Sequence, residues 1–242
     1  MTVMPRHGRL RLLLTPALVL VGIGVSIVIF FGLSAQSTDS FILNRAFLQD
    51  RFVGHVQLVL ISFLVATAVG VPVGVLLAQS GRLLRIPVFL VANLGQAVPS
   101  IGILVLFYAA FGLGVRPTIA ALVLYALLPV LRNTMVGVQG VDAAAVEAGR
   151  GMGMTRLQAL ARVQLPLAAP VIFAGLRTAL VLIVGTATLG NFVGGGGLGD
   201  VIASGINQSD RIVFVGAVMV ASLALLADWA LGLVERVLTP RV

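Results

Sequence analysis

The apolar residues of this chain lie in long runs that are separated by short polar segments containing arginine. An α-helix needs about 20 mostly apolar residues to cross the roughly 30 Å hydrocarbon core of a bilayer. None of the runs shows the alternation of apolar and polar residues that is typical of a membrane-spanning β-strand. The pattern therefore predicts an all-α membrane protein with about six transmembrane helices. The expected spans are residues 12–33, 56–79, 86–113, 117–136, 168–192 and 212–233.

The first run, Leu12–Leu33, follows Arg6, Arg9 and Arg11 and so resembles a secretory signal peptide. It is longer than the apolar region of such a signal, and the residues after it form a poor cleavage site. We therefore expect it to remain as the first span. The third run contains Pro99, which we expect to break its helix.

The connections between the expected spans are short, except for an outer segment at residues 34–54 and an inner one at residues 137–165. No repeat of solenoid length is visible, so we expect a single transmembrane domain covering residues 1–242.

Arginine placement predicts the orientation of the chain, because cytoplasmic loops of membrane proteins carry an excess of basic residues. With the amino terminus inside, the outer segments hold Arg45, Arg51, Arg116 and Arg211, and far more arginines fall inside. The inner arginines are Arg6, Arg9, Arg11, Arg82, Arg85, Arg132, Arg150, Arg156, Arg162, Arg236 and Arg241. Both termini are therefore expected to be cytoplasmic.

Composition excludes several classes of protein. Apolar residues make up 59% of the chain and charged residues 10%, whereas soluble domains carry about 25% charged residues. The chain has no cysteine, two histidines and no lysine, so it has neither a thiolate metal site nor the lysine of a phosphate-binding P-loop. The net charge of +8 is explained by topology, so no nucleic-acid partner is expected. We expect no catalytic residues, because the acids are scattered and no serine pairs with a histidine inside a span.

The inner segment at residues 137–165 contains the signals of two short helices. Asp142 is placed to cap the first, Gly151 and Gly153 interrupt it, and Thr155 is placed to cap the second. Pro166 is placed to begin the next span. The segment is therefore predicted to form a helix–turn–helix against the inner face of the membrane.

This segment resembles the signature of the inner-membrane permeases of bacterial ABC importers, which reads Glu-Ala-Ala, three residues, Gly, nine residues, then Ile-x-Leu-Pro. The chain departs from it at Gly149, which replaces the second alanine, and at Val163, which replaces the isoleucine. The matching residues, with Gly149 and the neighbouring Arg150 included, are Glu147, Ala148, Gly149, Arg150, Gly153, Leu165 and Pro166.

The resemblance implies a type I ABC importer permease fold in the bacterial cytoplasmic membrane. It implies that the segment is a coupling helix docked on a separate ATPase subunit, where Gly153 allows close backbone approach. It also implies that ATP and Mg²⁺ are bound by that ATPase and that this chain holds no cofactor. The further expected partners are a second permease subunit, an extracytoplasmic solute-binding protein and membrane lipid.

Other motifs resemble a narrower group, the osmoprotectant permeases that import glycine betaine, choline and carnitine. They include Gln96–Ser100, Leu128–Thr134, Gly185–Gly190, Gly194–Gly199 and Ala227–Trp229. Importers of methionine or another small solute remain as alternatives. A self-contained secondary transporter or channel, or a membrane enzyme, is a further alternative from the residues alone.

Two polar groups inside the expected spans are candidates for the solute pathway, because broken helices and hydroxyl groups line such routes. They are Gln96, Pro99 and Ser100 in the third run, and Thr186, Thr188 and Asn191 in the fifth. Packing between helices is the competing explanation for both groups.

Three further features have simpler interpretations. Arg177 is expected to extend its charged end to the inner interface. His55 is expected to lie at the outer interface, and Gly194–Gly199 is expected to form a flexible outer loop.

Overall fold

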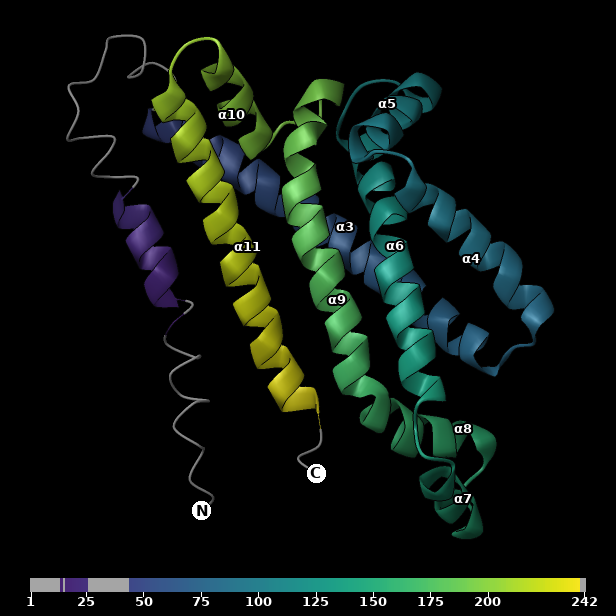
Figure 1. Cartoon of the computed structure of the whole chain (residues 1–242). Helices are drawn as coiled ribbons and strands as arrows, with labels where there is room; N and C mark the ends of the chain where they lie inside the picture. The colour runs from purple at the N-terminus through teal and green to yellow at the C-terminus, as the bar shows by residue number, and fades with distance from the viewer. Residues whose placement is uncertain (1–13, 15, 26–43, 240–242) are drawn as a thin grey trace.

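The computed structural model describes residues 14, 16–25 and 44–239, and these residues contain helices and no strand (Figure 1). Besides a helix at Pro16–Val25, the α-helices are α3 (Arg45–Gln79), α4 (Arg82–Ala97), α5 (Ser100–Phe111), α6 (Val115–Gln139), α7 (Ala143–Gly151), α8 (Arg156–Ala159), α9 (Leu165–Ala187), α10 (Leu198–Ile206) and α11 (Asp210–Leu238). A π-helix, η1 (Leu160–Gln164), joins α8 to α9, and a 3-10 helix, η2 (Thr188–Val193), follows α9.

Four helical segments among the described residues are long and apolar enough to cross a membrane. They are Arg45–Gln79, Val115–Gln139, Arg156–Val193 and Asp210–Leu238. Each contains one of the expected spans, but α3 begins at Arg45, whereas the expected span begins at residue 56. The Asn44 side chain caps α3 by accepting a hydrogen bond of 2.8 Å from the Phe47 backbone N–H. Residues 45–54, which were expected to lie in an outer connection, thus form the first turns of α3.

The third expected span is divided at the predicted place. α4 ends at Ala97 and α5 begins at Ser100, with Pro99 as its N-cap. Proline has no N–H for the helical ladder and disfavours the helical conformation of the residue before it. α4 has 16 residues, about 24 Å of helix. α5 lies at the upper end of the bundle at an angle to α4 (Figure 1).

α6 lies in the middle of the bundle, with α3 passing behind it and α9 beside it (Figure 1). Small residues allow this close packing, as they do between membrane helices generally. A Cβ atom at Gly70 of α3 would lie 2.6 Å from Val130 Cγ1, and one at Gly175 of α9 would lie 2.7 Å from the Pro129 carbonyl oxygen. The main apolar core is therefore built around α6.

The first expected span can be compared with the structure only in part. The helix Pro16–Val25 falls inside it, and its remaining residues lie outside the described part of the chain apart from Leu14. This helix contacts α11: a Cβ atom at Gly22 would lie 3.5 Å from the Ser222 hydroxyl oxygen.

Candidate functional site

The inner connection forms a helical hairpin, α7 and α8, that projects from the lower end of the bundle (Figure 1). Asp142 Oδ1 caps α7 by accepting a hydrogen bond of 3.0 Å from the Ala144 N–H. Thr155 and Gln158 form a capping box at the start of α8, because each side chain accepts a hydrogen bond from the other residue's backbone N–H. Both predicted caps are confirmed.

The turn after α7 is a Schellman motif. The Met154 N–H donates to the Gly149 carbonyl at 3.2 Å, and the Gly153 N–H donates to the Arg150 carbonyl at 2.9 Å. Gly153 has φ of 87°, a left-handed conformation that glycine adopts without steric cost. No atom lies within 4 Å of a Cβ placed at Gly153. The backbone conformation of the turn therefore requires glycine here, and packing within this chain does not.

The signature contains both exposed and buried residues. Glu147, Ala148 and Arg150 are exposed, whereas Gly149 is buried. A Cβ at Gly149 would lie 3.3 Å from Val163 Cγ2, so this residue packs inside the hairpin.

Part of the signature lines a shallow hollow on the hairpin. It is lined by Glu147, Arg150, Gly153, Met154 and Thr155. Leu165 and Pro166 are half-buried at the start of α9, away from this hollow.

Two exposed apolar side chains on the hairpin were missed by the sequence analysis. Met152 is 74% exposed and Leu157 is 73% exposed. Apolar residues within an otherwise polar segment are the signal that could have identified them. With Glu147, Ala148 and Arg150 they form what we call the hairpin surface, a set of exposed charged and apolar side chains that could contact another protein.

The candidate pathway residues lie near the upper end of the bundle, where α5 and η2 pack against α6. Gln96 lies in the last turn of α4, and its Nε2 donates a hydrogen bond of 3.1 Å to the Tyr125 carbonyl of α6. That carbonyl lies four residues before Pro129, which has no N–H to donate to it. Gln96 therefore replaces a missing helical hydrogen bond.

The other pathway candidates have varied surroundings. Thr188 Oγ1, at the start of η2, donates to the Gly185 carbonyl of α9 at 2.7 Å. Pro99 is exposed, whereas Ser100, Thr186 and Asn191 are half-buried. The structure thus places Pro99 and Ser100 at the break between α4 and α5, and Thr188 and Asn191 on η2.

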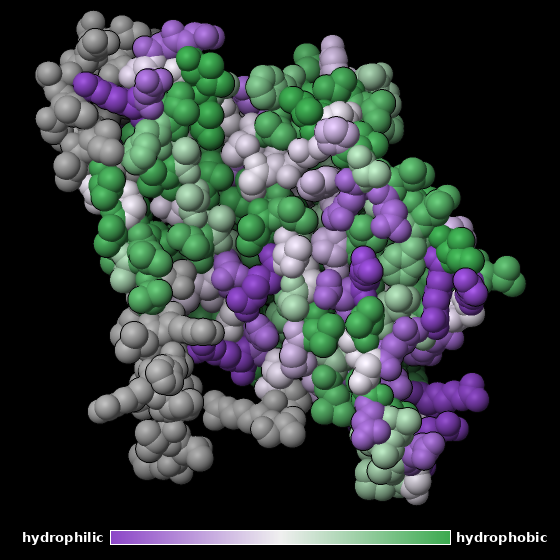
Figure 2. All heavy atoms as spheres, in the orientation of Figure 1, coloured by the Kyte–Doolittle hydropathy of each residue, from purple (hydrophilic) through white to green (hydrophobic). Residues whose placement is uncertain are grey.

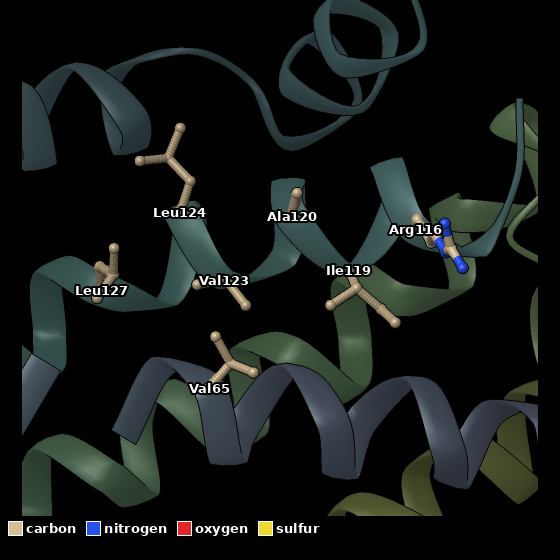
Figure 3. A pocket seen from close by; sticks show the side chains of 7 residues that line it. All are labelled: Val65, Arg116, Ile119, Ala120, Val123, Leu124 and Leu127. Atoms are coloured by element: carbon tan, nitrogen blue, oxygen red, sulfur yellow. The ribbon is translucent and has the colours of Figure 1, made fainter. Parts of the chain in front are cut away.

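An open groove between α3 and α6 is lined almost entirely by apolar side chains. Figure 3 shows its lining residues, Val65, Arg116, Ile119, Ala120, Val123, Leu124 and Leu127. Arg116 lies at one end of the α6 segment and Leu127 at the other (Figure 3). Apart from Arg116, the lining side chains offer no hydrogen-bonding group to a polar solute.

His55 is completely buried, so the expectation that it lies at the interface is wrong. The Leu198 N–H donates to His55 Nδ1 at 3.3 Å, and Nε2 lies 3.2 Å from the Val184 carbonyl oxygen. Because Nδ1 accepts a hydrogen bond, the proton belongs on Nε2, which donates to Val184. One side chain of α3 thus joins the end of α9 to the start of α10.

The glycine-rich segment Gly194–Gly199 is densely packed, in contrast to the expected flexible loop. Gly197 lies against His55, and Gly199 lies against the Thr188 carbonyl group. α10 follows it at Leu198–Ile206, inside what was expected to be a connection.

α10 is fixed to the start of α3 by charge. Arg51 Nη1 lies 2.8 Å from Asp200 Oδ2, and the Arg51 guanidinium also lies over the Phe47 ring, 5.1 Å from its centroid. Burial raises the pKa of the Asp200 carboxyl above its ordinary value, and the positive charge of Arg51 opposes this shift.

Arg177 was expected to extend its charged end to the inner interface. In the structure it also forms ion pairs within the chain. Its guanidinium pairs with Asp228 at 3.3 Å and with Glu235 at 2.8 Å, both on α11. Within the described ranges, no three His, Cys, Asp or Glu side chains are grouped so that they could hold a metal ion.

Comparison with known proteins gives a consistent result. The family described as "Binding-protein-dependent transport system inner membrane component" matches residues 70–239. The glycine betaine/carnitine/choline transport system permease protein OpuCD of Bacillus subtilis (strain 168) is 42% identical over 199 residues, which cover 81% of this chain and 86% of that protein. The osmoprotectant import permease protein OsmW of Salmonella typhimurium is 39% identical over 204 residues, which cover 82% and 94%.

Solved structures agree on the fold. A chain of the inward-facing MetNI methionine ABC transporter matches with a TM-score of 0.72 at 23% identity, covering 85% of this chain and 100% of that chain. An amino acid ABC transporter matches with a TM-score of 0.66 at 18% identity, covering 84% and 99%. The predicted all-α permease fold of the type I importers is confirmed.

Proposed function

The chain belongs to the family of binding-protein-dependent transport system inner membrane components, and from this premise we propose that it is the permease subunit of an ATP-driven osmoprotectant importer. Its solutes are small quaternary ammonium compounds such as glycine betaine, choline and carnitine. The chain forms one transmembrane domain and passes the solute into the cytoplasm by alternating access, driven by a separate ATPase subunit.

The similarity to osmoprotectant permeases is the observation that carries this proposal. The two relatives above match more than four fifths of this chain and more than four fifths of their own length. The likeness to the methionine transporter, at 23% identity, supports the fold and does not favour methionine as the solute.

Uptake by the complete transporter tests the solute class. Cells that lack other osmoprotectant importers would express this chain with its ATPase, its second permease subunit and its binding protein. We expect uptake of labelled glycine betaine, choline or carnitine that stops when the ATPase is inactivated. Uptake that continues without ATPase activity would favour a self-contained transporter, and uptake of methionine alone would reject the osmoprotectant assignment.

We also propose that the hairpin surface docks on the ATPase, which binds ATP and Mg²⁺. The exposed charges of Glu147 and Arg150 can make charge-assisted hydrogen bonds to a partner. The exposed side chains of Met152 and Leu157 can bury apolar area, which supplies about 25 cal/mol per Å². The hairpin is capped at both helix starts, so a partner would bind a preformed surface.

Substitutions on the exposed side of α7 test this docking. Ala148→Trp adds bulk at an exposed position, and Glu147→Ala removes a charge. If Glu147 forms a charged hydrogen bond, its loss costs about 1.5–3 kcal/mol, which is roughly tenfold or more in affinity. We expect less ATPase to copurify and uptake to fall, with normal membrane insertion. Gln208→Trp, at an exposed position beyond α10, is the control; if all three variants assemble equally, the docking assignment fails.

We propose that Gln96, Pro99, Ser100, Thr186, Thr188 and Asn191 shape the outer part of the solute route. The break between α4 and α5 supports this, because interrupted helices expose backbone groups that need water or a polar partner. In Gln96→Ala, Ser100→Ala and Pro99→Ala we expect altered ratios of choline to glycine betaine uptake. A lower melting temperature with an unchanged ratio would instead assign these residues to packing.

We propose that both termini are cytoplasmic. The hairpin and the lower end of α11 lie at the same end of the molecule (Figure 1), as arginine placement requires. A reporter fused before Met1 should be active in the cytoplasm. Extracytoplasmic activity of that fusion would reverse the proposed orientation.

A further inference from the structure

A cluster of charged side chains joins α9 to α11 in the spanning part of the bundle. Arg177 Nη1 lies 3.3 Å from Asp228 Oδ1, and Arg177 Nη2 lies 2.8 Å from Glu235 Oε2. The side chains remain partly exposed, at 41% for Arg177, 31% for Asp228 and 27% for Glu235. The ion pairs therefore leave an open side on which the charges meet their surroundings.

The depth of this cluster follows from helix geometry. At 1.5 Å per residue, Arg177 lies about 18 Å from the start of α9 at Leu165. Asp228 lies about 15 Å from the end of α11 at Leu238 by the same measure. α11 has 29 residues, about 43 Å of helix, which extends roughly 7 Å beyond each side of a centred 30 Å hydrocarbon core. By this measure Asp228 lies within the hydrocarbon level, whereas Glu235 lies only about 4.5 Å from the end of α11, at the inner boundary of the core. Arg177 pairs with both residues.

The exposed side of α3 near the middle of that helix is different in character. Leu60, Ile61, Leu64 and Val65 are all exposed, from 41% at Val65 to 62% at Leu64. In contrast, Figure 2 shows hydrophilic side chains gathered over the lower parts of α9 and α11, below the hydrophobic upper part of α11. The two faces thus have surfaces suited to two different surroundings.

Lipid is a poor neighbour for the charged face. Placing a charged side chain at the centre of a bilayer costs at least about 2.5–3.5 kcal/mol, and less near the interface; charged residues in spanning helices generally face a bundle interior or a water-filled cavity. Ion pairing reduces the cost but does not remove it, because the open side still meets the surroundings. The apolar face of α3 carries no such cost.

We infer that the charged face, which we define as Arg177, Thr178, Asp228 and Glu235, meets water and lines the inner part of the solute route. The part of this inference that concerns a solute route rests on the proposed function. The contact of the face with water can be tested independently of that function. Thr178 is exposed and follows Arg177 on α9, about 100° round the helix, so it tests the edge of the charged face. These residues lie on different helices from the outer candidates at the break between α4 and α5.

The chain contains no cysteine, so a single introduced cysteine can be labelled without background. Thr178→Cys tests the charged face, and Leu64→Cys on α3 is the control. Thr178 is 13 residues from the lower end of α9 and Leu64 is 15 residues from the lower end of α3, so both lie near the middle of their helices. A cationic, membrane-impermeant methanethiosulfonate reacts with a cysteine that water reaches and not with one that faces lipid.

The complete transporter in proteoliposomes would be treated with this reagent from both sides of the membrane. We expect Thr178→Cys to be labelled at least tenfold faster than Leu64→Cys. Both variants should be labelled fully by a membrane-permeant maleimide after solubilisation, which shows that both cysteines are reactive. Equal rates of labelling by the impermeant reagent would overturn the inference.

Transport after labelling tests whether the face is on the solute route. Attaching a bulky cation at position 178 should lower the uptake of labelled glycine betaine at least fivefold, whereas the same treatment of Leu64→Cys should not. Fast labelling of Thr178→Cys with unchanged uptake would place the face in water but off the route, and would overturn the inference. If no variant and not even the parent chain takes up an osmoprotectant, the proposed function fails, while the labelling rates still decide whether the face meets water.

Discussion

The turn between α7 and α8 and the turn between η2 and α10 lie at opposite ends of the bundle (Figure 1), and both contain glycine at positive φ. Around Gly153, in the lower turn, a Cβ would meet no atom within 4 Å. Around Gly197, in the upper turn, a Cβ would lie 2.9 Å from His55 Nδ1. The lower turn is open on its outside, whereas the upper turn is enclosed by α3, α6 and η2.

This difference indicates how each turn tolerates change. The lower turn needs a backbone conformation, which other residues with some tolerance for positive φ can supply in part. The upper turn also needs the space that a Cβ would occupy, and every residue other than glycine has a Cβ. Substitutions in the upper turn should therefore have larger effects on stability than those in the lower one.

The largest effect is expected for His55→Leu. Leucine fills much of the space but leaves the Leu198 N–H and the Val184 carbonyl without their buried partner. Each unsatisfied group costs about 1–3 kcal/mol, so we expect a loss of about 4 kcal/mol in the free energy of unfolding. The melting temperature of the solubilised chain should fall clearly, and His55→Gln should recover part of it because its amide can both donate and accept. An unchanged melting temperature in His55→Leu would mean that the upper turn is not held by this residue.

A smaller but still large effect is expected for Gly199→Ala. The added Cβ would lie 2.8 Å from the Thr188 carbonyl carbon, and backbone atoms cannot move aside as a side chain can. Overpacking of this kind costs up to about 3 kcal/mol. Gly185→Ala is the control, because a Cβ there meets nothing within 4 Å and alanine favours the helix. Equal melting temperatures in both variants would contradict the closed packing of the upper turn.

The sequence could not have predicted the upper turn, because its contacts are long-range. His55 lies 129 residues from Val184 and 143 residues from Leu198 in the chain. A run of glycines has no local signal that distinguishes a mobile loop from a close approach of helices. The same reason explains why the ion pairs of Arg177 and the hydrogen bond from Gln96 to Tyr125 were not predicted.

The lower turn was predicted because its determinants are local. The caps at Asp142 and Thr155 act on backbone groups two or three residues away, and Gly153 lies two residues after the end of α7. Long apolar runs likewise predicted the positions of the main spanning helices. What local signals could not give is which side of α7 is exposed, since that depends on where Gly149 meets Val163 and Met154.

A moderate effect is expected for Gly153→Ala, which keeps the space but strains the backbone. A left-handed conformation costs an L-residue about 1–2 kcal/mol. Local rearrangement of the turn should weaken copurification of the ATPase more than it lowers the melting temperature of the bundle. Gly153→Asn should be milder, since asparagine visits this conformation more readily. If the Gly153→Ala and Gly153→Asn variants both assemble with the ATPase as well as the parent chain does, the turn does not need positive φ for docking.

The smallest effect is expected for Gly149→Ala, where two terms of opposite sign nearly cancel. Alanine in place of glycine inside a helix stabilises it by up to about 1 kcal/mol. The added Cβ would lie 3.3 Å from Val163 Cγ2 and 3.4 Å from Met154 Sδ. Both neighbours are side chains, and methionine in particular adapts to small changes in shape. We therefore expect a change within about 0.5 kcal/mol and normal copurification of the ATPase, because Gly149 packs inside the hairpin and not on the hairpin surface. If the ATPase no longer copurifies while the melting temperature is unchanged, Gly149 instead contacts the partner. The lower turn would then need the space beside a glycine as strictly as the upper turn does.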